Sequence, residues 1–494
     1  MRFRSTRSEN LAVDSPQALL AGLAPDGGLY VPEAVPRLDP ELLSTPGLPY
    51  GDLAARVIGP WFDELPGARL GAAIEAALRR FDDPRVAPLV RAGELNILEL
   101  FHGPTLAFKD LALTLFGALL TMAREAAGLA DELLVVVATS GDTGSAALAG
   151  LEGVPGVRVV VLFPAEGISR VQRLQMTTCA APNALVLGID GNFDDAQRTA
   201  KALMTDPGLG LRLAARGLRT CSANSINVGR LVPQIAYYVH AYAGLVAKGL
   251  VGAGQDLDLA VPSGNFGNVL AARYAKAMGL PLGRFIVATN RNRVLADFLE
   301  SGIYDRNRPF HVTSSPSMDI LVSSNLERLL FEATGRDAAR VAGLMGDLAE
   351  RGHYELSPKE REAFGDFVGG SADETEAAAT IKNVFEETGY LLDPHTATAV
   401  AVLAKLGRSG PSLVTATASP FKFAFTVAEA IGLRTDGGEG REDEFATLGR
   451  LAERANLPLP PQLEGLESRQ VRHERVVAPR AVGAAIEAWV GGAR

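Results

Sequence analysis

The sequence predicts an α/β fold with parallel-rich sheets flanked by helices, plus a mainly helical insertion. Apolar, β-branched runs alternate with helical segments at residues 133–139, 157–163 and 184–190. Continuous apolar runs are typical of parallel strands that helices cover on both faces. The same alternation returns at residues 257–261, 285–289 and 412–417. Between them, residues 301–390 are dominated by charged helical segments, which indicates the insertion.

Turns and helices are expected before the first of these runs. Asp26, Gly27 and Gly28 must bend the chain ahead of a short extended segment. A brief strand at 96–100 leads into a polar turn, and the helix after that turn stops at Gly128. The helices expected in this part lie near residues 51–58, 70–81 and 111–127.

The rest of the chain supplies the helices that cover the sheets. Gly279 and Pro281 end one of them, because neither residue continues a helix well. The tail after the last strand is expected to be helical. The other helices begin at Ser145 or lie near residues 169–178, 193–204, 226–242, 268–278 and 396–406.

This order of elements predicts two domains and an insertion, without internal repeats. A small α/β domain, residues 130–215, is expected inside a larger one. The mainly helical insertion comprises residues 301–390, and residues 1–95 form a helical and turn-rich N-terminal segment of the large domain. The remainder of the large domain comprises residues 96–129, 216–300 and 391–494.

Composition and charge favour a small-molecule substrate. The net charge of −9 and the lack of a basic stripe argue against a nucleic-acid surface. Cys179 and Cys221 form no CxxC pair, which suits a reducing compartment, and the histidines form no HExxH motif, so no metal is expected. No run approaches the ~20 apolar residues of a membrane helix. We expect a cytoplasmic monomer or homodimer without a membrane or nucleic-acid partner.

One lysine, Lys109, stands between apolar residues in the polar turn at 101–110. An ammonium in an apolar setting loses proton affinity, and the neutral amine can attack a carbonyl group. Alternatively, Lys109 snorkels to solvent from the start of a helix that Asp110 caps. This segment alone leaves both interpretations open.

Two glycine-containing loops each join an expected strand to a helix, where backbone N–H groups can bind an anion. Neither loop has the glycine spacing of a dinucleotide fingerprint, and no Walker lysine follows. An ordinary capped turn is the alternative for each. The first loop offers Thr139, Ser140, Gly141, Asp142 and Thr143. The second offers Gly264, Asn265, Phe266, Gly267 and Asn268.

A third loop follows the run at 412–417, which ends in the hydroxyl-bearing residues Thr415 and Thr417. Ligands of α/β sheets gather at the carboxyl ends of strands, and all three loops occupy that position. Taken singly, Thr417 is better explained as a cap than as a ligand group. Together with Lys109, the loops predict a site for a molecule that carries an aldehyde, a phosphate and a carboxylate.

These motifs resemble those of the threonine synthases, which are pyridoxal-phosphate enzymes of the two-domain, tryptophan-synthase-like fold type II. The resemblance runs through most of the chain. Two of its motifs, residues 316–320 and 323–325, separate threonine synthases from dehydratases and other synthases of this fold. The remaining motifs are residues 26–32, 102–110, 140–144, 263–268 and 417–418.

The resemblance implies a role for each loop. Lys109 would hold pyridoxal 5'-phosphate covalently and then act as acid and base, while Thr417 would face the pyridine nitrogen. The cofactor phosphate would be held by Gly264, Asn265, Phe266, Gly267 and Asn268. The substrate carboxylate would be held by Thr139, Ser140, Gly141 and Thr143, with Asp142 capping the helix or facing the ring hydroxyl. Candidates for the substrate phosphate are Ser317, Ser324, Asn325, Arg293 and Lys422, although Lys422 could equally be a surface cation.

By the same resemblance, the chain is a lyase that converts O-phospho-L-homoserine and water to L-threonine and phosphate by γ-elimination and β-addition. A hydroxyl at the ring nitrogen, unlike a carboxylate, leaves the pyridine largely unprotonated and favours elimination or replacement over transamination. Arg293, Ser419 and Thr114 depart from residues frequent in this family, so they leave the substrate contacts open. The alternatives are a dehydratase or β-replacement enzyme of the same fold, or a non-catalytic protein that binds phosphorylated amino acids.

Overall fold

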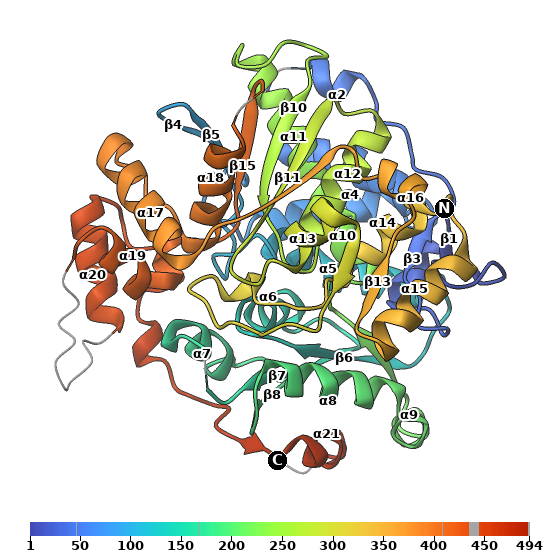
Figure 1. Ribbon diagram of the computed structural model, residues 1–494. Helices are drawn as coiled ribbons and strands as arrows, with labels where there is room; N and C mark the ends of the chain where they lie inside the picture. Colours follow the sequence, from blue (N-terminus) through green and yellow to red (C-terminus); the bar gives the residue numbers. More distant parts are fainter. Residues whose placement is uncertain (46, 167, 408, 434–443, 493–494) are drawn as a thin grey trace.

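The computed structural model describes residues 1–45, 47–166, 168–407, 409–433 and 444–492. Two parallel-rich sheets lie one above the other, each with helices packed around it (Figure 1). The upper sheet has six strands in the order β14-β11-β10-β15-β5-β4, and the lower sheet has five in the order β16-β8-β7-β6-β9. The predicted α/β fold class is confirmed.

The six-stranded sheet is built around β10, in which every residue is buried. β10 pairs in parallel with β11 and β15, and β4 is the one antiparallel strand of this sheet. Its strands are β4 (Leu89–Ala92), β5 (Leu95–Glu99), β10 (Leu257–Pro262), β11 (Leu282–Thr289), β14 (Phe367–Ser371) and β15 (Ser412–Ala416). The helices associated with it include α5 (Asp110–Ala126), α11 (Pro233–Ala247), α12 (Gly267–Met278), α13 (Val294–Ser301), α17 (Glu374–Thr388) and α18 (Pro394–Leu406).

The five-stranded sheet is parallel throughout. The three apolar runs predicted as strands form its centre, within one residue of the expected bounds. Its strands are β6 (Glu132–Ala138), β7 (Val157–Pro164), β8 (Ala184–Ile189), β9 (Leu218–Ser222) and β16 (Val476–Val477). Its helices are α6 (Asp142–Leu151), α7 (Arg170–Thr177), α8 (Phe193–Thr205), α9 (Pro207–Ala214) and α21 (Val482–Val490).

Three strands lie where the sequence predicted other structure. β14 falls in the segment expected to be mainly helical, and it contains Gly369, where a Cβ would lie 2.7 Å from the backbone of Ala296 in α13. The glycine weakens the strand signal but allows this close packing. β9 lies beyond the expected boundary at residue 215, and β16 lies in the expected helical tail, yet both extend the five-stranded sheet. The division into domains stays a prediction.

The N-terminal segment contains a small antiparallel sheet, of which the sequence indicated only the short extended segment after Gly28 that forms β3. It consists of β1 (Arg2–Ser5), β2 (Ala12–Asp14) and β3 (Tyr30–Pro32). The two helices predicted in this segment are present as α3 (Tyr50–Ile58) and α4 (Gly67–Leu78). Two shorter helices, α1 (Ser15–Ala21) and α2 (Glu41–Ser44), precede them. A second small pair, β12 (Ile303–Asp305) and β13 (His353–Glu355), lies in the insertion.

The described parts of the insertion and of the C-terminal segment contain five further α-helices. They are α14 (Leu326–Ala333), α15 (Ala338–Glu350), α16 (Pro358–Glu362), α19 (Ala424–Ala430) and α20 (Glu444–Ala455), with the short α10 (Val228–Leu231) before α11. Within the described residues, no helix combines the length and hydrophobicity that crossing a bilayer requires.

The turn that carries Lys109 is anchored at its start by His102. The Nδ1 atom of His102 lies 3.0 Å from an Asp82 oxygen, and Nε2 lies 2.8 Å from an oxygen of Glu99, at the end of β5. Tyr390 donates its hydroxyl to the other Glu99 oxygen at 2.8 Å. Burial opposes the charged form, but the hydrogen bonds to both carboxylates raise the pKa of His102 to about 9.

This pKa predicts how stability depends on pH. A raised pKa means that the stabilisation is complete below the ordinary value of about 6.5 and is lost as the pH rises through about 9. At 1.36 kcal/mol per pKa unit, the contribution amounts to about 3 kcal/mol. In the natural protein we expect the free energy of unfolding, measured with guanidinium, to fall between pH 6 and pH 9.5. In His102→Gln most of this fall should be absent.

The exposed His353 provides the matched control, because His353→Gln should leave the pH dependence as it is in the natural protein. An identical pH dependence in His102→Gln and the natural protein would contradict the assignment.

Candidate active site

Lys109 is held at the carboxyl end of the six-stranded sheet. Ala107 pairs with Ala418, just beyond β15, and the N–H of Phe108 donates to the carbonyl of Thr417 at 2.9 Å. The Lys109 side chain is 12% exposed, and its Nζ lies 3.2 Å from both Asp142 Oδ2 and Ser317 Oγ. Three segments that are distant in the sequence therefore meet at this amine.

The surroundings of Lys109 favour a reactive amine over a snorkelling side chain. Burial lowers the pKa of Lys109 below its usual value; Asp142 opposes this effect, and the charges of Lys422 and Arg230 add to it. The prediction that Asp110 caps the following helix is wrong. Helix α5 begins at Asp110, whose carboxylate turns back and accepts from the N–H and hydroxyl of Thr105 at 2.8 and 2.6 Å.

The carboxylate of Asp142 accepts hydrogen bonds from four side chains around Lys109, including Lys109 itself. Its Oδ2 accepts from Lys109 and from the Ser317 hydroxyl, at 3.2 and 3.0 Å. Its Oδ1 accepts from Lys422 at 2.6 Å and from the Gln172 amide at 3.0 Å. Although burial opposes it, the positive charges of Lys109 and Lys422 hold the pKa of Asp142 well below its usual range. Asp142 is thus an anion that faces Lys109, and it does not cap α6.

Hydrogen bonds within the loop before α6 fix its conformation. The Thr139 hydroxyl accepts from the N–H groups of Gly141 and Gly144, both at 2.9 Å. Gly141 has φ 136°, and a Cβ there would lie 2.5 Å from the Gln172 side chain, so glycine is required. Ser140 and Thr143 stay partly exposed. These two hydroxyls, at the N-terminus of a helix, remain accessible to a ligand.

The second glycine loop follows β10 and opens α12. Phe266 adopts left-handed backbone angles at the N-cap of α12, φ 63° and ψ 6°, which are rare for a bulky residue. The Asn268 side chain donates to the carbonyl of Pro262 at 3.0 Å and closes the loop on itself. The first N–H groups of α12 lack carbonyl partners within the helix and can face an anion.

Two hydroxyls next to these loops have no hydrogen-bond partner among the described residues. They are the buried Ser263 hydroxyl, just after β10, and the Thr417 hydroxyl, just after β15. Because β10 and β15 are parallel and Ala260 pairs with Val414, Ser263 and Thr417 stand at the same level of adjacent strands. Buried polar groups in proteins are rarely left unpaired, so both hydroxyls are available to a ligand.

The segment at 316–325 covers the second glycine loop. A Cβ at Gly264 would lie 2.7 Å from the carbonyl oxygen of Ser317, and the Ser323 hydroxyl donates to the Gly264 carbonyl at 2.8 Å. Ser324 and Asn325 donate to Asn265, at 3.3 and 3.0 Å. Ser317 thus contacts Lys109, and Ser324 and Asn325 contact the second glycine loop, while their roles in binding stay predictions.

A histidine that the sequence did not single out supports Ser317 from behind. The buried His395 accepts the N–H of Ser317 at Nε2, 3.2 Å away. Its Nδ1 then carries the proton and donates to Asp393 at 2.8 Å. The DPH sequence at 393–395 was the available signal, but only the fold places it beside Ser317.

The two cations that the sequence suggested for the substrate phosphate, Lys422 and Arg293, are already paired with carboxylates of the protein. Lys422 is fully buried and bonds to Asp142 and to the Thr105 carbonyl, so the surface interpretation of Lys422 is wrong. Arg293 is 52% exposed, and its Nε donates to Asp297 at 2.7 Å.

A cation that the sequence did not suggest, Arg230, lies close to this site. Arg230 is 3% exposed, and among the described residues its side chain makes one hydrogen bond, from Nη1 to the carbonyl of Ala223. Its buried Nε has no partner. The preceding Ser225 comes within 3.9 Å of a Cβ built on Gly267, so this segment borders the second glycine loop. Arg230 is thus a buried cation with free donors.

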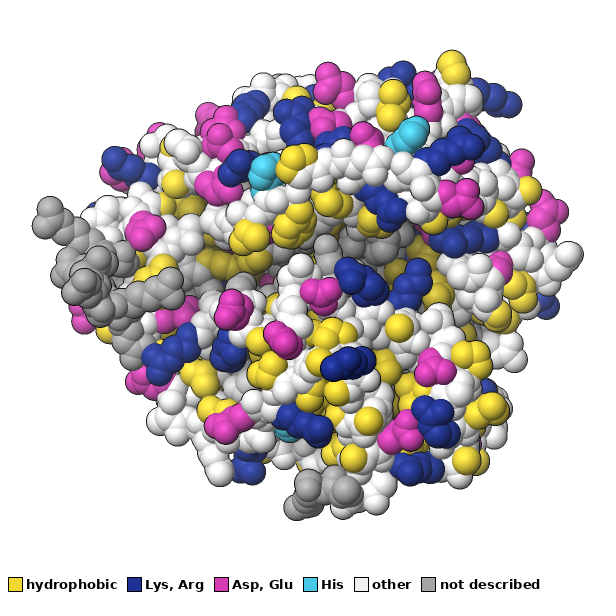
Figure 2. Space-filling view, turned by 60° about the horizontal axis from the view of Figure 1, so that its bottom comes forward, with side chains coloured by type: hydrophobic (Ala, Val, Ile, Leu, Met, Phe, Trp, Pro, Cys, Tyr) yellow, Lys and Arg dark blue, Asp and Glu magenta, His cyan; other side chains and the backbone are white. Residues whose placement is uncertain are grey.

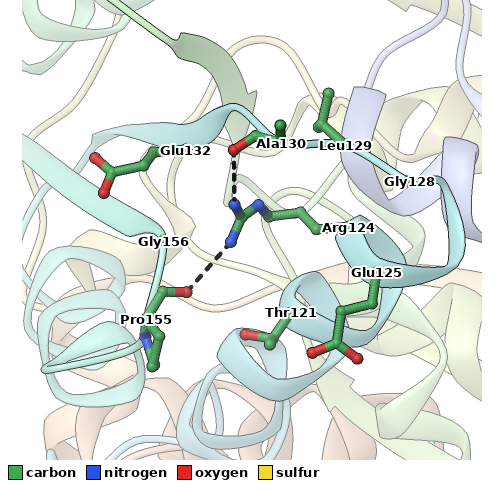
Figure 3. Close-up of a pocket in the computed structure, with 9 residues that line it drawn as sticks. All are labelled: Thr121, Arg124, Glu125, Gly128, Leu129, Ala130, Glu132, Pro155 and Gly156. Carbon is green, nitrogen blue, oxygen red and sulfur yellow. Dashed lines mark hydrogen bonds between the residues drawn. The ribbon is translucent and has the colours of Figure 1, made fainter.

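One surface cavity lies outside the group of predicted site residues. A hollow lined by hydrophobic side chains crosses the face seen in Figure 2. A separate surface cavity of about 510 Å³ is lined by Arg124, Glu125, Glu132 and neighbouring residues (Figure 3). Its Arg124 already donates to the carbonyls of Ala130 and Pro155. None of the predicted site residues lines that cavity.

The tight packing of Gly264 against Ser317 gives a prediction. In Gly264→Ala the new methyl group must push the two loops apart, and such overpacking costs about 1–3 kcal/mol. We expect a lower thermal unfolding midpoint. Gly346→Ala in α15 is the control, since no atom lies within 4 Å of its Cβ position and alanine favours a helix. An unchanged midpoint for Gly264→Ala would show that the two loops are not tightly packed.

Comparison with known proteins agrees with this arrangement. Residues 2–78 match the family model of the threonine synthase N terminus, and residues 83–417 match that of pyridoxal-phosphate dependent enzymes. Threonine synthase of Pseudomonas aeruginosa is 41% identical over 87% of this chain and 90% of its own. Threonine synthase-like 1 of Homo sapiens is 37% identical over 93% of this chain but only 63% of its own.

The fold leads to the same group of proteins. The crystal structure of PLP-bound threonine synthase from Brucella melitensis superposes with a TM-score of 0.87, at 37% identity and over 99% of both chains. The chain belongs to the threonine synthase family of pyridoxal-phosphate dependent enzymes.

Proposed function

We propose that this protein converts O-phospho-L-homoserine and water to L-threonine and inorganic phosphate, using pyridoxal phosphate bound through Lys109. The observation that carries the proposal is the Lys109 amine, buried between Asp142 and Ser317 where two anion-binding loops meet. A lysine so placed gives up its proton readily, and a neutral amine is what a carbonyl cofactor requires.

The unpaired groups of the site fit this cofactor. The Ser263 hydroxyl and the first N–H groups of α12 would hold its phosphate, and the Thr417 hydroxyl would meet its ring nitrogen. When bound, pyridoxal phosphate supplies an electron sink that makes protons on the substrate carbons removable. Ser140 and Thr143, at the start of α6, would bind the substrate carboxylate, while Thr139 and Gly141 shape that loop.

Lys109 would carry the protons of the reaction. Its amine would face the substrate Cα, where it could take and return a proton. Asp142 and Ser317 hold the amine in place through its two hydrogen bonds.

Arg230 is our candidate for the group that binds the substrate phosphate. Burial lowers the pKa of Arg230 to about 10, so it is still a cation at neutral pH. A dianion in a buried site needs a cation with free N–H groups, and Arg230 has them. Ser324 and Asn325 contact Asn265 on the loop next to it and could add hydrogen bonds.

The setting of the protein is part of the proposal. Both Cys179 and Cys221 are free thiols, which supports the cytoplasm as its compartment. We propose no nucleic-acid partner, in line with the negative net charge. Whether the protein is a monomer or a homodimer stays a prediction.

The reaction is tested by supplying O-phospho-L-homoserine and measuring threonine and phosphate together. We expect equal amounts of both products. Lys109→Ala should abolish them and also remove the visible absorbance of the bound cofactor, because no other amine replaces Lys109. The surface variant Lys405→Ala should keep both properties, since Lys405 is paired with Glu376 away from the site.

Phosphate release by a folded Lys109→Ala protein would contradict the proposal. Turnover of serine or threonine without phosphate would instead favour a dehydratase or β-replacement enzyme. Binding of the phosphorylated amino acid without any turnover would favour the non-catalytic alternative.

The role of Arg230 gives a separate prediction. Loss of a charged hydrogen bond costs about 1.5–3 kcal/mol, so Arg230→Met should lower kcat/KM for O-phospho-L-homoserine about 10- to 100-fold. The affinity for pyridoxal phosphate should change little. Arg293→Met is the matched control and should keep natural kcat/KM, because Arg293 pairs with Asp297 at the surface. A large loss of kcat/KM in Arg293→Met but not in Arg230→Met would instead show that Arg293 binds the substrate phosphate.

A further inference from the structure

Lys422 is a buried cation without a role in the proposed reaction. Its side chain is 0% exposed, whereas lysines are almost never fully buried unless paired. Lys422 lies in a short 3-10 turn, Pro420–Phe423, which follows β15 and Thr417. Its Nζ lies 2.6 Å from Asp142 Oδ1 and donates to the carbonyl of Thr105 at 2.8 Å. Lys422 thus bridges Asp142 to the turn that leads to Lys109.

Asp142 is shared between two lysines at unequal distances. Lys422 lies 2.6 Å from Oδ1, and Lys109 lies 3.2 Å from Oδ2. A buried carboxylate that faced Lys109 alone would hold a proton on its amine, since an ion pair is far more stable there than an unpaired charge. With Lys422 present, the negative charge of Asp142 already has a cation. Lys109 can then lose its proton without leaving Asp142 unpaired.

The other contacts decide which lysine keeps its proton. Lys422 has a second acceptor, the Thr105 carbonyl, and the carboxylate of Asp110 is stabilised by its charge. Lys109 has the Ser317 hydroxyl, which can also donate, and the positive charge of Arg230 opposes a proton on Lys109. On the remaining side stand the Phe108 ring, 5.6 Å away, and His395 behind Ser317. These surroundings favour charge on Lys422 and a neutral Lys109.

We propose that Lys422 is a positioning residue for the reaction: by pairing with Asp142, it leaves the Lys109 amine free of its proton and ready to react. The inference rests on the proposed role of Lys109 as the cofactor-binding lysine. It differs from the role as a phosphate ligand that the sequence suggested for Lys422.

The experiment is a pH titration of the visible absorbance of the full chain loaded with pyridoxal phosphate. The pH at which the band is half converted reports the proton affinity of the Lys109 nitrogen. In Lys422→Met this midpoint should rise by at least one pH unit, because the charge of Asp142 is no longer matched. Lys422→Arg should restore the natural midpoint to within a few tenths of a unit.

Two further variants keep the test decisive. Lys405→Met, at the surface, should leave the midpoint unchanged. If Lys422→Met does not fold, Lys422→Gln replaces it, because the glutamine amide can still donate to Asp142 but carries no charge. Its midpoint should rise for the same reason.

An unmoved midpoint in a folded, cofactor-loaded Lys422→Met or Lys422→Gln protein would overturn the role of Lys422. A protein with no visible band under saturating pyridoxal phosphate would instead refute the proposed function of Lys109. The two failures are therefore distinguishable.

Discussion

The carboxylate of Asp142 is the interaction on which the site depends. It lies at the start of α6, above the five-stranded sheet, and accepts from Lys109 at the start of α5, from Ser317 in the insertion and from Lys422 after β15. An unpaired buried charge is costly, so the carboxylate is stable only when these segments are together. The same contacts that join the two sheets therefore also place the reactive amine.

The backbone around this cluster is strained at two points. Leu106, in the turn before Lys109, has φ 61°, and Phe266, in the second glycine loop, has φ 63°. Each such residue costs of order 1–3 kcal/mol and persists only where the surroundings hold it. The Leu106 carbonyl accepts from Ser419 N–H at 3.0 Å, and Asn325 N–H donates to Asn265 at 3.1 Å. Packing of the loops against each other stabilises shapes that neither loop would adopt alone.

Features encoded by short segments were predictable from the sequence. The strands β6, β7 and β8 have continuous apolar residues, and the loops around Lys109 and Gly264 carry local motifs. Strands such as β9, β14 and β16 were missed. In β14, Gly369 meets α13 and Gly370 meets Val402 of α18, and β16 has only two residues that pair with β8. Their place in a sheet is set by a neighbour, which a local pattern does not contain.

Polar groups whose role depends on tertiary contacts were equally hidden. The sequence allowed Lys422 to be a surface cation, but the fold buries it against Asp142. Arg230 stands out only because its Nε is buried without a partner, and His395 because it meets the N–H of Ser317. In each case the residue type was visible, whereas its burial and its partners were not.

The central claim is that Lys109 is the residue that binds pyridoxal phosphate. The most direct measurement is to fix the bound cofactor with sodium borohydride, digest the protein and locate the modified lysine by mass spectrometry. The account predicts one modified site, at Lys109. Modification of another lysine, or no modification at all, would contradict it.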